Sequence, residues 1–396
     1  MLCAGDALAV HDTTGVETTH ARWPDQRADH CGQHHRQHRG RVRVRLCADR
    51  SHERVEHLPR DGRAHRAAGR AVPVDGPVVC GSERSSRGTA QRMKTARALL
   101  AICCGLLAAG RAGNAAVVFE ITSPYHHIRV IDQDGTRVLS FDGSTETRMS
   151  LRDPLRGHFE YTEYFHMPWL WNAQLTNVLM IGLGGGSAQR AYAHYYPQVT
   201  VNTAEIDPAV VEVAKQFFRF EQTPSQHVHV SDGRVFLRRS EMKYGAILVD
   251  AYVANRYGSF IPYHLATKEF FELAAGHLTT NGVIAYNVIG NLRGWRADLL
   301  GAIYKTMKSA FPQVYLFPAK ESQNVVIIGT RSAEKFSYVT IQERSVVLIQ
   351  STRVTLPNFR ERAYSFRIEP PPNWQGCPLL TDDFAPMEGL LRTGSQ

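Results

Sequence analysis

Residues 117–396 of this chain contain a single cysteine. Six of the seven cysteines precede residue 105, which leaves Cys377 for the rest of the 396-residue chain. One cysteine can form neither a disulfide framework nor a cysteine-rich zinc site. Residues 117–396 are therefore not a small domain stabilised by disulfides or by zinc. We expect no metal in this part of the chain.

An excess of charge of one sign is also missing from the same part. The formal net charge is +9, from 46 Lys and Arg against 37 Asp and Glu. Residues 1–116 hold 19 basic and 11 acidic residues, which leaves 27 basic and 26 acidic residues for the remainder. A nearly neutral domain lacks the basic surface that nucleic-acid binding needs, so we expect no nucleic-acid partner.

Residues 1–92 lack hydrophobic periodicity. They are rich in Arg, His, Gly and Ala, and they contain too few apolar residues to offset the entropy of an ordered chain. We expect this segment to be disordered, or to be a leader translated from a start codon placed too early. A basic tail that binds nucleic acid is the alternative.

The composition changes at Met93. Lys94 and Arg97 precede a 13-residue apolar run that ends at Gly110, and small residues follow. This order is typical of a secretory signal peptide, and the run is too short to span a membrane. We expect residues 93–116 to direct export to the periplasm if translation starts at Met93, and a cytoplasmic protein otherwise. A buried helix is the alternative for this segment.

The rest of the chain predicts an α/β protein in three parts. Residues 117–172 contain a hairpin signal, because "HHIRVID" and "TRVLSFDG" flank a tight Asp-Gly turn and indicate a small β-rich domain. Strand and helix patterns alternate over 173–330, which predicts a doubly wound, mostly parallel sheet. Residues 331–396 form a mixed C-terminal extension. The predicted strands are 177–182, 199–205, 227–231, 245–250, 282–288, 313–317 and 324–330, and the predicted helices are 187–196, 208–218, 267–278 and 295–310.

Glycines or carboxylates end four successive strands of this sheet. The series consists of Gly182, Gly184, Gly185 and Gly186 after the first strand, Glu205 after the second, Asp232 and Gly233 after the third and Asp250 after the fourth. Ligands of open parallel sheets bind beyond the carboxyl ends of the strands, so these residues define a candidate site. The acid on the second strand suits two ribose hydroxyls, and Asp232 suits an adenine amino group.

The glycine spacing selects among nucleotide ligands. A dinucleotide fingerprint has Gly or Ala where this chain has Ser187, and a P-loop needs a Gly-Lys-Ser/Thr that is missing. The spacing Gly182-x-Gly184-x-Gly186 is that of proteins that bind nucleoside sulfonium compounds, whose positive charge favours an acidic rim. Asp207, directly before Pro208, is instead predicted to be a helix N-cap.

With these motifs the sequence resembles the spermidine synthase family, the polyamine aminopropyltransferases, in its divergent spermidine-synthase-like branch. The likeness covers roughly residues 117–330 and rests on "FEYTEYFHMP", "GGGS", "AEIDPAVVEVAKQFF", "SDGRVFL" and "ILVDAY". It implies a Rossmann-like fold of the S-adenosylmethionine-dependent methyltransferase type. It also implies transfer of an aminopropyl group from decarboxylated S-adenosylmethionine to an amine, with release of methylthioadenosine.

The resemblance implies roles for individual residues. Glu205 matches the family's ribose-binding acid, and Asp232 with Gly233 matches the adenine-binding pair. Asp250 matches the catalytic aspartate, and Tyr161 the tyrosine beside the substrate. Gly184 to Gly186 match the glycine turn of the family.

The acceptor half departs from the family. The family has Tyr-Gln at Tyr125-His126 and again at Tyr161-Thr162, an acid at Ser187 and a second aspartate at Val253. A buried ammonium group needs carboxylates or amides around it, so we expect an altered pocket that includes His126, Thr162, Ser187 and Tyr252. His127, His166 and His264 are further candidates. Asp382 and Asp383 either supply the missing acids or lie in a surface turn.

Three functions remain open at this point. They are an aminopropyltransferase with an altered acceptor pocket, a class I S-adenosylmethionine-dependent methyltransferase, and a non-catalytic protein that binds a nucleoside or a polyamine. The co-substrate is decarboxylated S-adenosylmethionine or S-adenosylmethionine, and no metal takes part. The expected partner is a small-molecule amine, with no membrane span, and a homodimer through the N-terminal β domain is a further expectation.

Overall fold

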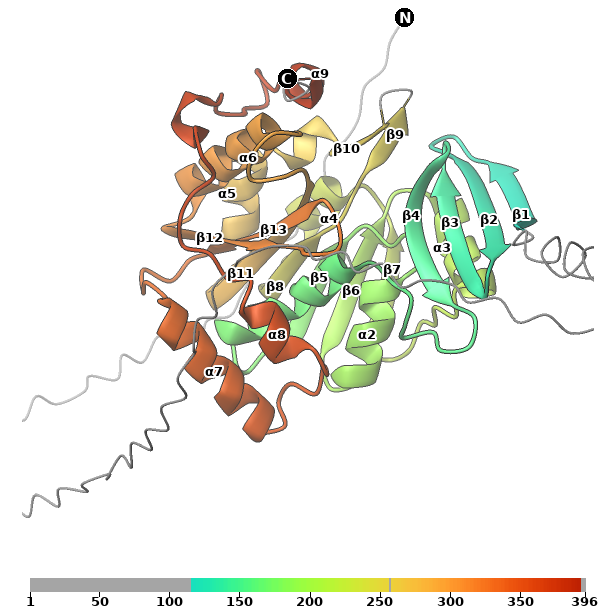
Figure 1. Ribbon diagram of the computed structural model, residues 1–396, viewed down its shortest axis with the longest axis horizontal. Helices are drawn as coiled ribbons and strands as arrows, with labels where there is room; N and C mark the ends of the chain where they lie inside the picture. Colours follow the sequence, from blue (N-terminus) through green and yellow to red (C-terminus); the bar gives the residue numbers. More distant parts are fainter. Residues whose placement is uncertain (1–114, 256–257, 393–396) are drawn as a thin grey trace, which may run out of the picture. The chain divides into compact units, whose positions relative to one another are not determined.

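The computed structural model describes residues 115–255 and 258–392, so the expected leader and nearly all of the expected signal segment lie outside the described residues. The described chain begins with a four-stranded antiparallel sheet in the order β1-β2-β3-β4 (Figure 1). Its middle strands form the predicted hairpin, and the outer two were not predicted. The strands are β1 (Ala116–Thr122), β2 (His127–Gln133), β3 (Thr136–Phe141) and β4 (Ser144–Ser150).

A seven-stranded sheet forms the centre of the second part, in the order β12-β13-β11-β8-β5-β6-β7. The five strands from β11 to β7 are parallel, and β13 is antiparallel to both β11 and β12. The predicted fold class is therefore confirmed. The strands are β5 (Asn177–Ile181), β6 (Thr200–Glu205), β7 (Gln226–Val230), β8 (Tyr244–Val249), β11 (Leu278–Ile289), β12 (Gln313–Pro318) and β13 (Asn324–Thr330). A small hairpin, β9 (Val253–Asn255) and β10 (Gly258–Phe260), follows β8.

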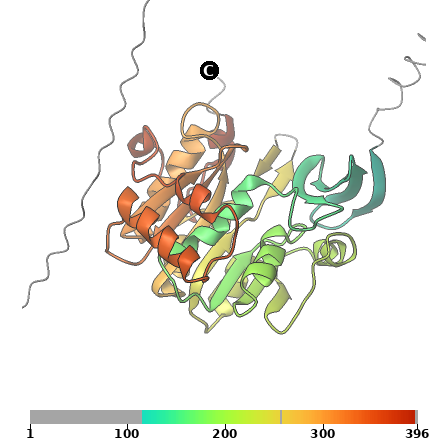
Figure 2. The same ribbon diagram turned by 60° about the horizontal axis from the view of Figure 1, so that its bottom comes forward.

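Helices cover both faces of the seven-stranded sheet (Figures 1 and 2). None of the helices in the described ranges is long and apolar enough to cross a membrane. The helices are η1 (Glu160–Leu170), α2 (Ser187–Tyr195), α3 (Pro208–Phe217), α4 (Gly233–Arg239), η2 (Tyr263–Leu265), α5 (Lys268–Gly276), α6 (Ala297–Ala310), α7 (Tyr338–Gln350), α8 (Phe359–Ala363), η3 (Trp374–Gly376) and α9 (Met387–Arg392).

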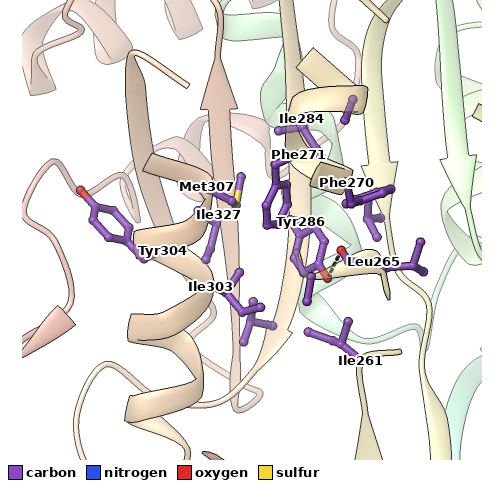
Figure 3. Packing of buried hydrophobic residues seen from close by; sticks show 14 of the residues in the cluster. Ile261, Leu265, Phe270, Phe271, Ile284, Tyr286, Ile303, Tyr304, Met307 and Ile327 are labelled. Atoms are coloured by element: carbon purple, nitrogen blue, oxygen red, sulfur yellow. Dashed lines mark hydrogen bonds between the residues drawn. The ribbon is translucent and has the colours of Figure 1, made fainter. Parts of the chain in front are cut away.

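The larger hydrophobic cluster packs α5 and α6 against one face of this sheet (Figure 3). Phe271 of α5 packs against the ring of the strand residue Tyr286 and against Phe270. The Tyr286 hydroxyl donates a 2.8 Å hydrogen bond to the Leu265 carbonyl. That bond satisfies the polar atom of a fully buried ring. On the other face η1, α2, α7 and α8 form a second cluster with the same strands.

The N-terminal sheet shares its core with α3. Ile128, Leu139 and Phe141 of this sheet pack against Val210 of α3 and Phe218 just after it. A sheet with one apolar face needs a second layer, and the helix after β6 supplies it. The sheet ends at the last residue of β4, whereas η1, placed in the same domain by the sequence pattern, packs into the cluster of the seven-stranded sheet.

Two helix starts follow from local side chains. The predicted N-cap Asp207 is confirmed, since its carboxylate accepts a 2.9 Å hydrogen bond from the Ala209 N–H. Helix α4 was not predicted, because it has only seven residues and begins at residues that were predicted to bind adenine. Asp232 caps it by accepting a 2.9 Å bond from the Val235 N–H.

Candidate functional site

A cavity of about 400 Å³ lies at the carboxyl ends of β5, β6 and β8, with β4 and η1 as further walls. It brings together most of the residues predicted from the sequence. Those that line it are His126, Tyr161, Thr162, Gly182, Gly184, Ser187, Glu205, Asp232, Gly233, Asp250 and Tyr252. Residues from sequence positions more than a hundred apart therefore meet in one site.

The first glycine of the turn is required by close packing. Gly182 has φ +99°, and a Cβ there would lie 2.2 Å from the Asp250 carbonyl oxygen. Gly184 also has a positive φ, +53°. The bare backbone thus lets the turn after β5 lie directly against the end of β8, beside the carboxylate of Asp250.

The next two glycines of the turn, Gly185 and Gly186, lie outside the lining of the cavity. The Gly185 N–H donates a 2.9 Å bond to Thr147 Oγ1, and a Cβ at Gly185 would lie 2.6 Å from the same side chain. Gly186 has φ +73°, and its Cβ would meet Phe220 at 3.1 Å. Both glycines let the turn pack against the neighbouring core and the N-terminal sheet.

Glu205 is held in place by backbone donors. Its Oε2 accepts a 2.8 Å bond from the Leu183 N–H, and its Oε1 accepts a 3.0 Å bond from the Asp207 N–H. Burial raises the pKa of Glu205, and these two hydrogen bonds counteract that effect. The carboxylate is therefore oriented towards the cavity by the chain segments on either side of it.

Asp232 is paired with a histidine. Its Oδ2 lies 2.7 Å from His264 Nε2, while its other oxygen caps α4. Burial opposes ionisation of this acid, but the bonds from His264 and the Val235 N–H outweigh it and lower the pKa of Asp232. The end of the cavity predicted to hold adenine thus contains an ionised acid with a histidine beside it.

Asp250 lies between two donors. Tyr161 donates its hydroxyl to Oδ2 at 3.0 Å, and Asn287 Nδ2 donates to Oδ1 at 2.9 Å. Burial raises the pKa of Asp250, and the two bonds counteract it. Burial and the charge of Asp250 also raise the pKa of Tyr161 well above 10, so its hydroxyl keeps its proton and remains a donor.

The sequence analysis missed Asn287, although a signal for it exists. It lies near the carboxyl end of β11, at the same edge as the carboxylates, and it interrupts the mostly apolar second half of that strand. Its own carbonyl oxygen Oδ1 accepts a 3.0 Å bond from Asn324 Nδ2. The same rule that identified Asp250 would have identified Asn287.

Two side-chain hydroxyls of the predicted acceptor pocket form hydrogen bonds with backbone groups. Tyr252 donates to the Asn287 carbonyl at 2.8 Å and accepts a 3.1 Å bond from the Ile289 N–H. Thr162 donates to the Phe159 carbonyl within its own helical turn. Both side chains therefore form walls of the cavity, with their hydroxyls already committed.

Ser187, where the family has an acid, lies beside the partly buried side chain of Arg190. Ser187 begins α2, and its Oγ accepts a 3.3 Å bond from Arg190 Nη2. The same guanidinium donates to the carbonyls of Gly185 and Phe218. Burial lowers the pKa of Arg190 to about 10, which leaves it charged at neutral pH. This edge of the cavity has a positive neighbour where the family has an acid.

The four candidate histidines separate into two pairs. His126 is 6% exposed, stacks on Phe141 and lines the cavity, as does His264. His127 lies outside the lining and pairs with an acid on β1. His166 is buried in the aromatic core, where burial lowers its pKa to about 3 and keeps it neutral. The sequence gives no sign of this division, because it depends on which side of each element faces the cavity.

The acids of the C-terminal extension do not replace the missing ones. Asp382 accepts two 2.7 Å bonds from Arg234 and one of 2.7 Å from Thr267. It ties the extension to α4 and α5 and does not line the cavity. The interpretation as turn residues was therefore correct for this pair, since Thr381 and Phe384 close the turn around it.

A further carboxylate, Glu146 of β4, lines the cavity and was missed entirely. It accepts a 3.1 Å bond from Ser259 Oγ. Nothing in its sequence surroundings distinguishes it from a solvent-facing residue of an antiparallel strand.

Comparisons with known proteins point to one family. The model of the spermine/spermidine synthase domain matches residues 158–329. A polyamine aminopropyltransferase of Vibrio vulnificus (strain CMCP6) is 30% identical over 298 residues, which cover 73% of this chain and 96% of the relative. An eEF1A lysine and N-terminal methyltransferase of Xenopus laevis is 30% identical over 184 residues, covering 45% of this chain and 26% of that protein.

A solved structure supports the fold. The probable spermidine synthase from Corynebacterium glutamicum ATCC 13032 superimposes with a TM-score of 0.50 at 18% identity, over 59% of this chain and 88% of that one. Within the described ranges no group of three or more His, Cys, Asp or Glu residues could hold a metal ion. With its fold, its cavity and a relative matched over nearly its whole length, the chain belongs to the spermine/spermidine synthase family of transferases.

Proposed function

We propose that this protein is a spermidine synthase-like aminopropyltransferase with an altered acceptor pocket. The donor is a decarboxylated S-adenosylmethionine-type compound, and the acceptor is an amine. The observation that carries the proposal is the placement of Asp250 between Tyr161 and Asn287, in the same cavity as Glu205 and Asp232. This puts a fixed carboxylate next to a nucleoside-sized site.

The reaction is a displacement at carbon. The lone pair of the acceptor nitrogen forms a bond to the propyl carbon next to sulfur, and the C–S bond breaks with its electron pair going to sulfur. The products are the aminopropylated amine, a proton and neutral methylthioadenosine. Asp250 orients the attacking amine and accepts its proton, while Tyr161 holds the carboxylate in position.

A second candidate function has one specific observation in its favour. At Ser187 the family acid is missing, and the nearest charge is the guanidinium of Arg190. A positive neighbour favours a donor that keeps its carboxylate, which is S-adenosylmethionine itself. In that case the chain transfers a methyl group. The presence of β4 and Tyr161 in the cavity lining favours the aminopropyl donor instead. Turnover must therefore be measured with each of the two donors.

The deciding experiment uses Asp250→Asn. The amide can donate to the Tyr161 oxygen and accept from Asn287, so the cavity keeps its hydrogen bonds while the charge is lost. Turnover of decarboxylated S-adenosylmethionine with an amine should fall by orders of magnitude, measured as methylthioadenosine release by mass spectrometry. Affinity for methylthioadenosine, measured by calorimetry, should stay nearly unchanged.

The control is Asp383→Asn, an exposed acid outside the cavity, which should behave as the wild type. Running the wild type with S-adenosylmethionine identifies the second candidate, because only a methyltransferase releases S-adenosylhomocysteine. Full activity of Asp250→Asn would contradict the mechanism, whichever donor is used.

A further inference from the structure

Strand β4 contains a β-bulge at the cavity wall. Thr145 pairs with Ser140 of β3, whereas Thr147 pairs with Leu139, so Glu146 is the extra residue between the two pairs. A bulge changes the direction in which neighbouring side chains point, and such irregularities occur next to active sites. Here it allows three consecutive residues of one strand, Thr145 to Thr147, to line the same cavity.

Within the described ranges, the polar neighbours of Glu146 include Ser259, Ser144 and His126. Ser259 Oγ donates to its carboxylate at 3.1 Å, and Ser144 lies 2.7 Å from that hydroxyl. Among the residues that the structure describes, no Lys or Arg forms an ion pair with Glu146. Burial raises the pKa of Glu146, and the charge of Asp250 adds to the effect. A cation bound between the two acids would relieve both causes.

The charges of the cavity are unequally distributed. Arg190 lies beside Ser187 at the glycine turn, while Glu146 lies on the N-terminal sheet, near Asp250 and His126. His126 is 6% exposed, lines the cavity and has a ring nitrogen, Nδ1, without a hydrogen-bond partner. Its nearest acid, Asp142, is 3.5 Å from that atom. An ammonium group is therefore favoured at the wall formed by β4 rather than at the turn.

We propose that Glu146 is a specificity-determining residue that binds the second ammonium group of a diamine acceptor, while Asp250 receives the attacking amine. The inference rests on the proposed transfer reaction. The carboxylates that the sequence lacks at Ser187 and Val253 are offset by one that β4 contributes to the cavity lining. A monoamine of the same length has no group for Glu146 and is the poorer acceptor.

The test compares putrescine with butylamine, which has the same carbon chain and one amine, in the wild type and in Glu146→Gln. For putrescine the substitution should lower kcat/KM by about ten- to a hundredfold, the effect of one lost charged hydrogen bond, mainly through KM. For butylamine it should change little. Glu146→Asp should recover part of the preference for the diamine.

A binding measurement tests the role of Glu146 independently of the proposed transfer reaction. Putrescine is titrated into protein saturated with methylthioadenosine, and its affinity should fall in Glu146→Gln even if no transfer is detected with any donor. Glu120→Gln, an exposed acid on β1 of the same sheet, is the matched control and should bind putrescine as the wild type does. Equal putrescine affinity in wild type and Glu146→Gln, or an equal loss for both amines, would overturn the inference. Absence of transfer together with lost putrescine binding would refute only the proposed reaction.

Discussion

Glu205 shows how single residues of the cavity are positioned by the chain around them. Both of its oxygens accept backbone hydrogen bonds, from Leu183 and Asp207. A carboxylate oxygen can accept a further bond, so the ribose hydroxyls of a nucleoside can be bound without moving the side chain. Such preorganisation lowers the entropy cost of binding.

Replacing Glu205 by Gln should therefore weaken methylthioadenosine binding. The amide has one acceptor oxygen instead of two and no charge, and the expected loss is about 1–3 kcal/mol. Calorimetry measures the affinity, and thermal unfolding without ligand shows separately what the lost backbone bond costs. Glu212→Gln on the exposed side of α3 is the control. If Glu205→Gln binds as tightly as the control, the ribose assignment is wrong.

At this scale, residues at strand ends were predictable and residues that depend on tertiary contacts were not. The order of strands along the chain was enough to bring Glu205, Asp232 and Asp250 to one edge. Glu146 was not predictable, because the bulge that directs it depends on how β3 and β4 pair. Nor was the pairing of Asp232 with His264, which joins segments 32 residues apart.

Among the elements, η1 depends on the C-terminal extension for its position. Arg362 of α8 donates to Glu163 at 2.6 Å and to Glu160 at 2.8 Å, and all three side chains are at least nine-tenths buried. Glu160 also accepts a 2.8 Å bond from the Lys320 N–H. Tyr161, the donor to Asp250, lies between the two glutamates in sequence. The extension thus stabilises the helix that carries a residue of the candidate active site.

Arg362→Met should destabilise the protein by about 3–5 kcal/mol, because it leaves the buried Glu160 without its cation and removes the guanidinium from Glu163. Urea unfolding measures this. Turnover should also fall, since Tyr161 loses its fixed position, while methylthioadenosine affinity should change less. The exposed neighbour Arg360→Met is the control within the same helix.

The acid sensitivity of the protein provides a second readout of the same contact. Burial raises the pKa of Glu163, but the bonds from His158 and Arg362 outweigh it and lower the pKa from 4.5 to about 2. The stabilisation is therefore complete above about pH 4.5 and is lost as the pH falls towards 2. Arg362→Met should lose less stability than the wild type over this range. A parallel loss in both proteins would contradict the assigned role.

For the whole molecule, the shared core between the N-terminal sheet and α3 has a thermodynamic consequence. The described residues belong to one compact unit, and the sheet has its apolar face against α3. Arg137 of β3 also donates a 3.0 Å bond to the Phe217 carbonyl at the end of that helix. Neither part keeps its hydrophobic contacts if the other unfolds.

We therefore expect the protein without residues 1–114 to unfold in one cooperative transition. Hydrogen exchange should give the same free energy of opening for the amides of β2 and of β6, and methylthioadenosine should raise both equally. Exchange from β2 at a distinctly lower free energy would show that the sheet opens independently.

At this scale the sequence indicated the fold class, since alternating strands and helices leave few arrangements. It did not indicate that the small sheet lacks a separate core. That property depends on which sheet the buried residues of α3 contact, and a helix of ten residues with four buried positions has the pattern of any amphipathic helix.

The extra residue of β4 gives the family a route for changing substrate that needs no new side chain. Deleting Thr145 would restore regular pairing with β3, keep Thr147 beside the glycine turn, and turn Glu146 to the outer face of the strand, because neighbouring residues of a regular strand point to opposite faces. A codon deletion alone could remove the charge from one wall of the cavity. If Glu146 binds the acceptor as we propose, such a deletion would change acceptor preference without any substitution in the cavity.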